Sequence, residues 1–187
     1  DVIVTNPPFG GEEEAGIQAH FPEGTRTSET ALLFLQFIMR SLKRSIGDRP
    51  GGRCAMVLPN GPLFAGGVAA RVKQELLEQF DLHTIVRLPN GVFAPYTSIP
   101  ANLLFFQRDG PTKEIWYYEL PLPAGRKQYP KTKPLQDAEF DECRAIWDKR
   151  PVAEHSWLVP VEQVVENNCN LDIKNPRSQD TLAHRSP

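Results

Sequence analysis

Four residues near the start of the chain, Asn6-Pro7-Pro8-Phe9, combine groups that could do chemistry on a planar nitrogen. Asn6 offers a side-chain carbonyl oxygen as a hydrogen-bond acceptor, and Pro7 offers a main-chain carbonyl held by its ring. Two acceptors that grip the two N–H bonds of an amino group would turn its lone pair toward an electrophilic methyl group. Phe9 could stack on the ring that carries the nitrogen. The plainer alternative, a strand ended by prolines and followed by a core phenylalanine, stays open.

The residues around this tetrapeptide predict where it lies. Residues 1–6 are apolar and β-branched, which indicates a buried strand of the parallel type, and the two prolines end it. Ligands of open α/β sheets bind at the carboxyl ends of strands, where the tetrapeptide stands. Residues 10–27 read as a loop, and residues 28–45 as an amphipathic helix that Thr27 or Ser28 can cap.

Alternating strand and helix patterns follow, which predict a doubly wound α/β sheet. The expected strands are 53–58, 82–88, 101–107 and 114–120, and a further helix is expected at 68–79. The strands at 82–88 and 101–107 have no helix between them, and such a short connection suits antiparallel neighbours. We therefore expect a mostly parallel sheet with one antiparallel strand near its edge.

The chain changes character after residue 120, so we divide it into the C-terminal half of a catalytic domain (1–120) and an extension (121–187). The extension opens with a proline-rich segment and is expected to contain a helix at 137–149 and a frayed tail at 176–187. Its basic cluster consists of Arg126, Lys127, Lys131 and Lys133. These cations could contact phosphate groups, or they could belong to a solvated loop.

The composition of the chain excludes few classes of function. The net charge of -2 gives no sign of nucleic-acid binding by the chain as a whole, so DNA contacts would come from local basic patches or from a partner. The three cysteines lack metal spacing and read as core residues of a protein in a reducing compartment, and the four histidines show no ligand pattern, so no metal site is expected. No apolar run approaches the roughly 20 residues of a membrane span, and no membrane partner is expected.

Residues 1–10, DVIVTNPPFG, resemble motif IV of the amino-methyltransferases that use S-adenosylmethionine, and Phe9 resembles the adenine-N6 enzymes among them. The resemblance continues in order through Ser28-Glu29 and the helix after it, residues 50–64 and residues 85–106. With Lys131-Thr-Lys-Pro134 and Asn170-Leu-Asp172 it covers about 1–175 and is typical of type I modification subunits. It implies part of a Rossmann-like methyltransferase fold with a helical extension.

The resemblance also implies roles for single residues. Asn6, Pro7, Pro8 and Phe9 would form the catalytic set, in which Asn6 and the Pro7 carbonyl hold the adenine amino group and Phe9 stacks on the base.

Three further residues would bind the substrate. Phe93 matches the position of a second stacking aromatic; Tyr96 competes for that role, and Phe93 could instead be a core residue in a turn. Asn60, within Pro59-Asn60-Gly61, would line the target-base or DNA side of the cleft, although this tripeptide is also a common turn.

The implied cofactor is S-adenosylmethionine, whose methyl group Asn6 and Pro7 would border. The glycine-rich turn that mainly holds this cofactor in the family has no counterpart here, because the chain begins at what resembles the fourth strand. We therefore expect the isolated 187 residues to be inactive, or nearly so.

The resemblance implies a cytoplasmic protein. Its implied partners are double-stranded DNA, a specificity subunit and a second modification subunit, with a restriction subunit as an optional addition. Two other functions stay open. One is methylation of protein glutamine or RNA, and the other is a non-catalytic fragment that only binds a specificity subunit.

Overall fold

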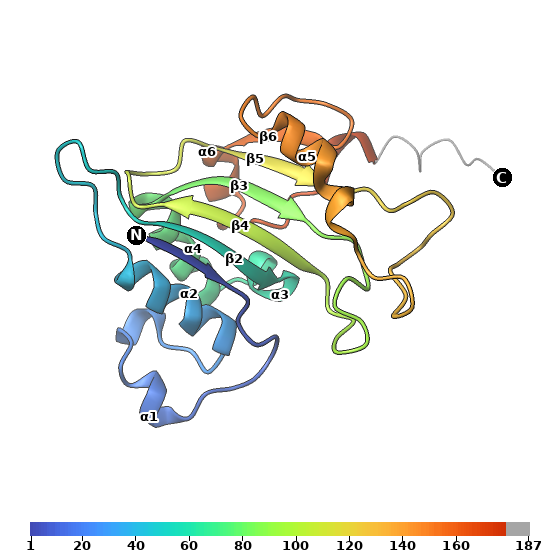
Figure 1. The fold of residues 1–187 in the computed structure, drawn as a ribbon. Coiled ribbons are helices and arrows are strands. Elements are labelled where there is room, and N and C mark those ends of the chain that lie inside the picture. The colour runs from blue at the N-terminus through green and yellow to red at the C-terminus, as the bar shows by residue number, and fades with distance from the viewer. Residues whose placement is uncertain (179–187) are drawn as a thin grey trace.

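A six-stranded mixed sheet forms the centre of the protein in a computed structural model that describes residues 1–178 (Figure 1). Its strands lie side by side in the order β1-β2-β4-β3-β5-β6. The strands are β1 (Val2–Thr5), β2 (Arg53–Pro59), β3 (Asp81–Arg87), β4 (Ala101–Gln107), β5 (Glu114–Glu119) and β6 (Ser156–Pro160).

Strand direction confirms the α/β class but corrects one detail of the prediction. β1 is parallel to β2 and β3 is parallel to β5, whereas β4 is antiparallel to both β2 and β3, and β6 is antiparallel to β5. The expectation of one antiparallel strand near the edge was therefore wrong, because there are two and β4 lies inside the sheet. Leu104 and Phe106 of β4 are fully buried, which suits an interior strand.

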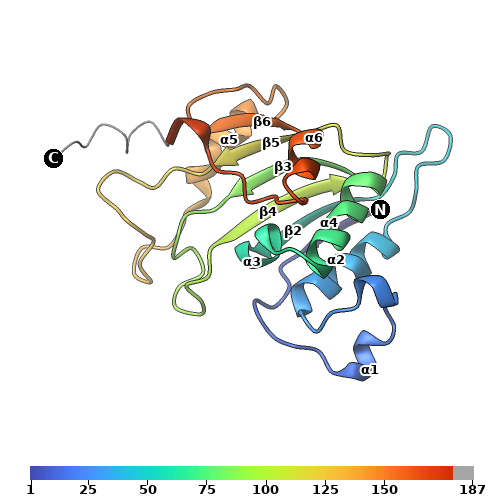
Figure 2. The ribbon, with the colours of Figure 1, turned by 180° about the vertical axis from the view of Figure 1, so that it is seen from behind.

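Helices cover both faces of the sheet, as in a doubly wound fold. Figure 2 shows α2, α3, α4 and α6 on one face, and Figure 1 shows α5 on the other. The helices are α1 (Ala15–Gln18), α2 (Thr30–Ser41), α3 (Asn60–Phe64), α4 (Val68–Gln79), α5 (Asp141–Ile146) and α6 (Val161–Glu166), with short 3-10 turns η1 (Glu23–Thr25), η2 (Asp137–Phe140) and η3 (Pro176–Ser178).

Two hydrophobic cores result. The larger one joins α2, α4 and α6 to the sheet and includes the buried thiols of Cys54 and Cys169, as expected for core cysteines. The smaller one packs α5 on β3 and β5, where Cys143 is buried and Trp147 meets Phe105 edge to face, with ring centroids 4.8 Å apart. Both cores hold the strand ends in place.

β1 departs from the buried strand that its sequence predicts. Val2 and Val4 are 60% and 77% exposed, while Ile3 packs against the larger core. The smaller core lies over β3 and β5, away from β1, so the alternate side chains of β1 stay uncovered. Within residues 1–178, β1 pairs with β2 alone.

The region after residue 120 is joined to the sheet, because β6 pairs with β5 along Glu114–Tyr118. β6 was not expected from the sequence, and the helix expected at 137–149 is shorter, as η2 followed by α5. The division into 1–120 and 121–187 stays a prediction. Most of the tail expected to be frayed (179–187) lies outside the described residues.

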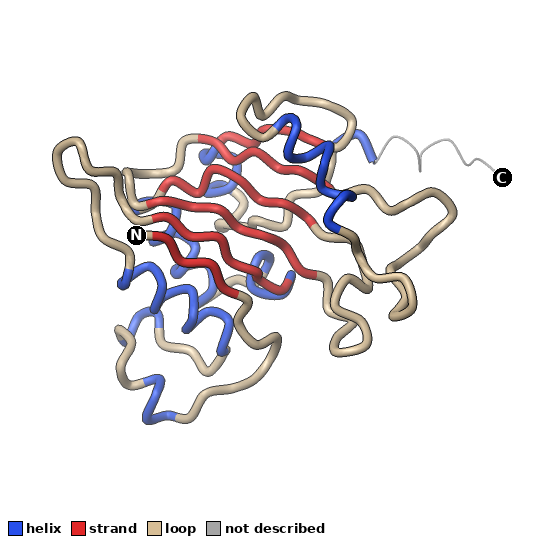
Figure 3. The backbone as a smooth tube through the Cα atoms, viewed as in Figure 1, coloured by secondary structure: helices blue, strands red, loops and turns tan. Residues whose placement is uncertain are grey.

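Long loops follow the carboxyl ends of β1, β3 and β5 on one side of the sheet, where α3 directly follows β2 (Figure 3). Among residues 1–178, no helix has the length and apolar character of a bilayer span.

Candidate active site

The tetrapeptide leaves the sheet directly after β1. Thr5, the last residue of β1, is in register with Met56 of β2, and Asn6 follows it. Asn6 is exposed, and within residues 1–178 its side-chain amide makes no hydrogen bond. Pro7 is buried and Phe9 is half-buried, so the rigid turn is anchored while the Asn6 amide stays free. A free amide at a strand end can accept hydrogen bonds from a ligand amino group.

The two predicted stacking aromatics meet in space. Phe93 lies in the loop 89–100 between β3 and β4, and its ring contacts that of Phe9 edge to face, with centroids 5.0 Å apart and planes at 79°. Such T-shaped contacts are a favoured aromatic geometry. The contact leaves no room for a base between the rings. A base would therefore stack on a free ring face or displace Phe93.

Tyr96, the competitor of Phe93, is exposed and makes no ring contact with Phe9 within the described residues. The main-chain N–H of Tyr96 donates to the carbonyl of Phe93 at 2.9 Å, which closes a tight turn, and the Tyr96 side chain is 92% exposed. The geometry therefore favours Phe93 over Tyr96 as the partner of Phe9.

Asn60 begins α3 immediately after β2, rather than standing in a simple turn. Its main-chain N–H donates to the carbonyl of Pro100 at 2.8 Å, and its side-chain oxygen accepts a hydrogen bond from Asn102 Nδ2 at 3.2 Å. Asn102 is only 2% exposed. The buried amide of Asn102 therefore fixes the orientation of the Asn60 amide.

Asn60 and Asn102 both line a cavity of about 760 Å³ at the carboxyl ends of β3 and β5. The cavity wall includes the ion pair between Arg87 Nη1 and Asp172 Oδ1, 2.7 Å apart and mostly buried. Residues 6–9 are not among its lining residues. Asn60 thus lines this cavity next to the start of β4, the strand that follows the Phe93 loop, whereas residues 6–9 do not line it.

A buried lysine holds α3 in place. Lys73 of α4 is 1% exposed, and its Nζ donates to the carbonyls of Leu63 at 2.6 Å and Ala65 at 2.9 Å. The N–H of Leu171 donates to the same Leu63 carbonyl at 2.9 Å. Burial lowers the pKa of Lys73 to about 8. Its ammonium therefore clamps the end of α3, whose start carries Asn60.

Sequence reasoning missed Asn102 and Lys73. A signal for Asn102 existed, since it is a polar residue within an apolar strand, and such residues when buried need a hydrogen-bond partner. Lys73 adjoins the buried Val72 on an otherwise ordinary amphipathic helix, so its position alone did not distinguish it from a surface lysine.

The chain is similar to proteins of one family. Residues 1–185 match the family model described as N-6 DNA Methylase. The methylase subunit of the type I restriction enzyme EcoEI of Escherichia coli is 49% identical over 191 residues, which cover 98% of this chain and 38% of that subunit.

Two solved structures share the fold and much of the sequence. One, described as a modification subunit of a type I restriction enzyme from Vibrio vulnificus, has 56% identity and a TM-score of 0.92 over 98% of this chain and 40% of its own. The other comes from work on complex assembly of the type I restriction–modification system, with 50% identity and a TM-score of 0.87 over 94% of this chain and 37% of its own. The chain thus spans about two fifths of the length of these relatives.

Proposed function

Because the chain belongs to the N-6 DNA methylase family, we propose that it contributes the target-adenine side of the active site in a type I modification subunit. That subunit would transfer a methyl group from S-adenosylmethionine to N6 of an adenine flipped out of duplex DNA. The observation that carries the proposal is the free, exposed amide of Asn6 at the end of β1, close to the paired rings of Phe9 and Phe93.

The chemistry follows from these groups. Asn6 Oδ1 and the Pro7 carbonyl oxygen would each accept a hydrogen bond from the adenine amino group. This grip fixes the nitrogen and directs its lone pair out of the plane of the base. The same two acceptors stabilise the positive charge that develops on nitrogen as its bond to the methyl carbon forms. Pro8 keeps the backbone rigid, and a face of Phe9 supports the base.

S-adenosylmethionine would supply a methyl group activated by its positively charged sulfur. Residues of this chain suit contact with one side of S-adenosylmethionine, because the Asn6 amide is unpaired and lies at a strand end where ligands of α/β sheets bind. Asn6 and Pro7 would border the methyl group. A strand followed by a glycine-rich turn and a helix, the main cofactor-binding element of the family, is not found in these 187 residues.

Partner subunits would supply sequence recognition. The chain has a net charge of -2 and lacks an evident DNA-reading element, which supports a division of labour with a specificity subunit. We include a second modification subunit, and optionally a restriction subunit, in the same assembly. A related structure that comes from work on complex assembly of the type I restriction–modification system supports assembly with other subunits.

A methyl-transfer assay with the full-length gene product and its specificity subunit tests the proposal. The assay would offer S-adenosylmethionine with a labelled methyl group to duplex DNA, RNA and protein, and locate the label by mass spectrometry. We expect N6-methyladenine in DNA. Label in RNA or on protein glutamine would favour the alternative substrates, and no transfer to any of them would favour a binding role alone. The isolated 187 residues should transfer little or no methyl group.

A further inference from the structure

The basic segment, which we define as residues 126–133, is a cluster of positive charge that the proposed site leaves unused. Residues 120–136 contain four cations and no acidic residue, a local charge of +4 in a chain whose net charge is -2. We propose that the basic segment binds the phosphates of duplex DNA beside the flipped adenine. This inference rests on the proposed function and adds the surface that receives the duplex.

Tyr129 fixes the basic segment to the loop that carries Phe93. Its side chain is 1% exposed, and its main-chain N–H donates to the carbonyl of Asn90 at 2.9 Å. Its hydroxyl donates to Glu139 Oε1 at 2.8 Å, which ties the segment to η2 as well. Tyr129 therefore joins the basic segment both to the loop 89–100 and to η2.

Gly91 allows the backbone of the loop 89–100 to approach the backbone of the basic segment closely. Gly91 has φ +81°, and a Cβ atom built on it would lie 2.4 Å from the main-chain oxygen of Tyr129. Only a residue without a side chain allows the two backbones to approach so closely. The loop 89–100 and the basic segment therefore form one surface, which Figures 1 and 2 show beyond the carboxyl ends of the strands.

The lysines of this surface are available to a partner. Lys127, Lys131 and Lys133 are exposed, and within residues 1–178 none of them forms an ion pair. Arg126 lies over the ring of Tyr129, with its guanidinium carbon 5.7 Å from the ring centroid. Glu139, the nearby acid, already accepts hydrogen bonds from Tyr129 and Gln136. Within residues 1–178, Glu139 forms no ion pair with Arg126, Lys127, Lys131 or Lys133, so these cations are not paired with a carboxylate.

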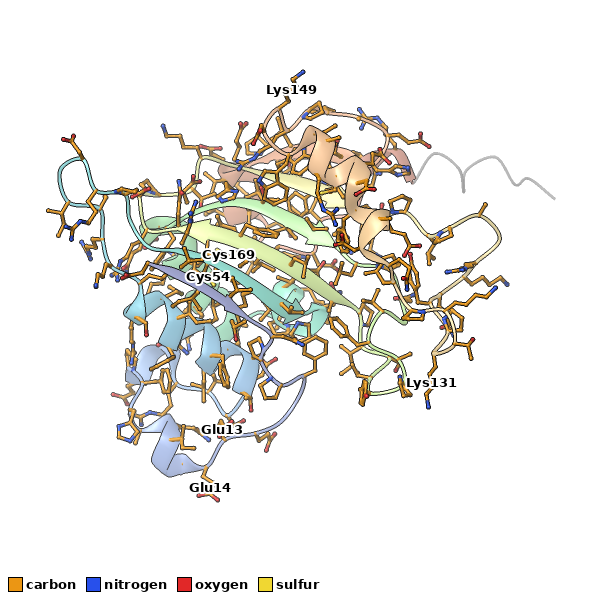
Figure 4. All side chains as sticks on the ribbon, in the orientation of Figure 1. Glu13, Glu14, Cys54, Lys131, Lys149 and Cys169 are labelled. Carbon is orange, nitrogen blue, oxygen red and sulfur yellow. The ribbon has the colours of Figure 1, made fainter. Side chains whose placement is uncertain are left out.

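Geometry and charge together favour DNA. A base that reaches Phe9 and Phe93 remains attached to a backbone whose flanking phosphates must pass close by. Lys131 projects outward at the side of the loop 89–100, whereas Lys149 projects from the far end of the molecule (Figure 4). Lysines that neutralise phosphates release counterions, and this makes binding depend on salt.

The test compares two triple variants of the full-length gene product assembled with its specificity subunit. The first is Lys127→Ala, Lys131→Ala and Lys133→Ala. The matched control is Arg44→Ala, Arg49→Ala and Lys149→Ala, which removes the same charge from exposed positions elsewhere. Affinity for a fluorescent duplex would be measured between 50 and 300 mM salt (roughly the range over which counterion release is resolved), together with subunit assembly by size exclusion and methyl transfer.

We expect the first variant to lose roughly tenfold or more in DNA affinity at low salt, for any sequence tested. Its slope of log affinity against log salt should become less negative by about 2 to 3, since each lost phosphate contact contributes about 0.9. The control should keep the wild-type slope. Equal slopes in both variants would overturn the inference, and so would loss of assembly in the first variant, which would make the surface a subunit interface. Because binding is measured separately from methyl transfer, an inactive wild type that still binds duplex would refute the proposed function without removing this test.

Discussion

The ring of Phe93 meets the ring of Phe9 edge to face, although the two residues belong to loops that follow different strands. Phe9 follows β1 and Phe93 follows β3, with β2 and β4 between these strands in the sheet. The contact thus joins the loop after β1 to the loop after β3 at the carboxyl ends of the strands, where Asn6 also lies.

In the full-length gene product assembled with its specificity subunit, replacement of Asn6 by alanine should abolish most methyl transfer without unfolding the protein. Loss of one preorganised polar group that stabilises transition-state charge costs about 10²–10³ in rate. Asn6 is exposed and unpaired, so the free energy of unfolding should stay within about 0.5 kcal/mol of wild type. Single-turnover methyl transfer and urea unfolding measure the two effects. The exposed Asn167→Ala is the control, and a variant at position 6 that turns over like this control would remove Asn6 from the mechanism.

Phe93→Ala should harm catalysis more than Tyr96→Ala. Base–aromatic stacking contributes about 1–3 kcal/mol, so loss of Phe93 should lower kcat/KM by roughly 5- to 150-fold. Tyr96 is 92% exposed and forms no ring contact with Phe9 within residues 1–178, so its loss should change kcat/KM by much less. Steady-state kinetics on one DNA substrate compares them. The opposite ranking would assign the stacking role to Tyr96.

Gly91→Ala should destabilise the protein more than Gly125→Ala. Both glycines have φ near +80°, where an alanine costs about 1–2 kcal/mol. A Cβ atom at Gly125 meets nothing within 4 Å, whereas one at Gly91 meets the Tyr129 backbone. The difference in unfolding free energy between the two variants therefore measures the steric clash between a side chain at position 91 and the Tyr129 backbone. Urea unfolding that gave the same loss for both would argue against a close junction.

The stability of the wild type should rise with pH relative to Lys73→Met. Burial lowers the pKa of Lys73 from its ordinary 10.5 to about 8, so between these values the unfolded chain binds more protons than the folded one. Unfolding free energy then increases with pH, at about 1 kcal/mol per pH unit in this window. Urea unfolding from pH 7 to pH 10 measures the difference between the two proteins. Lys149→Met, at an exposed site, should show no such trend, and a flat difference for Lys73→Met would contradict the buried clamp.

Local sequence patterns predicted those helices and strands that have a clear apolar period of their own. The helix expected at 68–79 and the strand expected at 101–107 match α4 and β4, because each has a clear apolar period. β6 escaped prediction, since Trp157 and Val159 alone alternate in a five-residue strand that ends at Pro160. The position of β4 inside the sheet depends on pairing with two distant strands, which no local pattern encodes.

The candidate site likewise contains residues that could be predicted from the sequence and contacts that could not. Asn6 and Phe9 could be found from spacing and from the strand before them, and the contact of Phe93 with Phe9 agrees with its predicted role. The hydrogen bond from Asn102 to Asn60 and the Lys73 clamp join elements that are separate in sequence. Such partners emerge only when the chain is folded, because burial decides which polar groups must find each other.

The reversed direction of β4 has a consequence for how the site could change. The last residues of β3 pair with the first residues of β4. Both ends of the loop 89–100 are therefore fixed at the same end of the sheet. The closure entropy of such a loop grows slowly with length, at about 0.6 kcal/mol for each doubling. Insertions near Tyr96 would therefore lengthen the exposed part of this loop at small thermodynamic cost and leave the sheet register intact. The loop 89–100 can accordingly accept additional residues without any change in the two strands on either side of it.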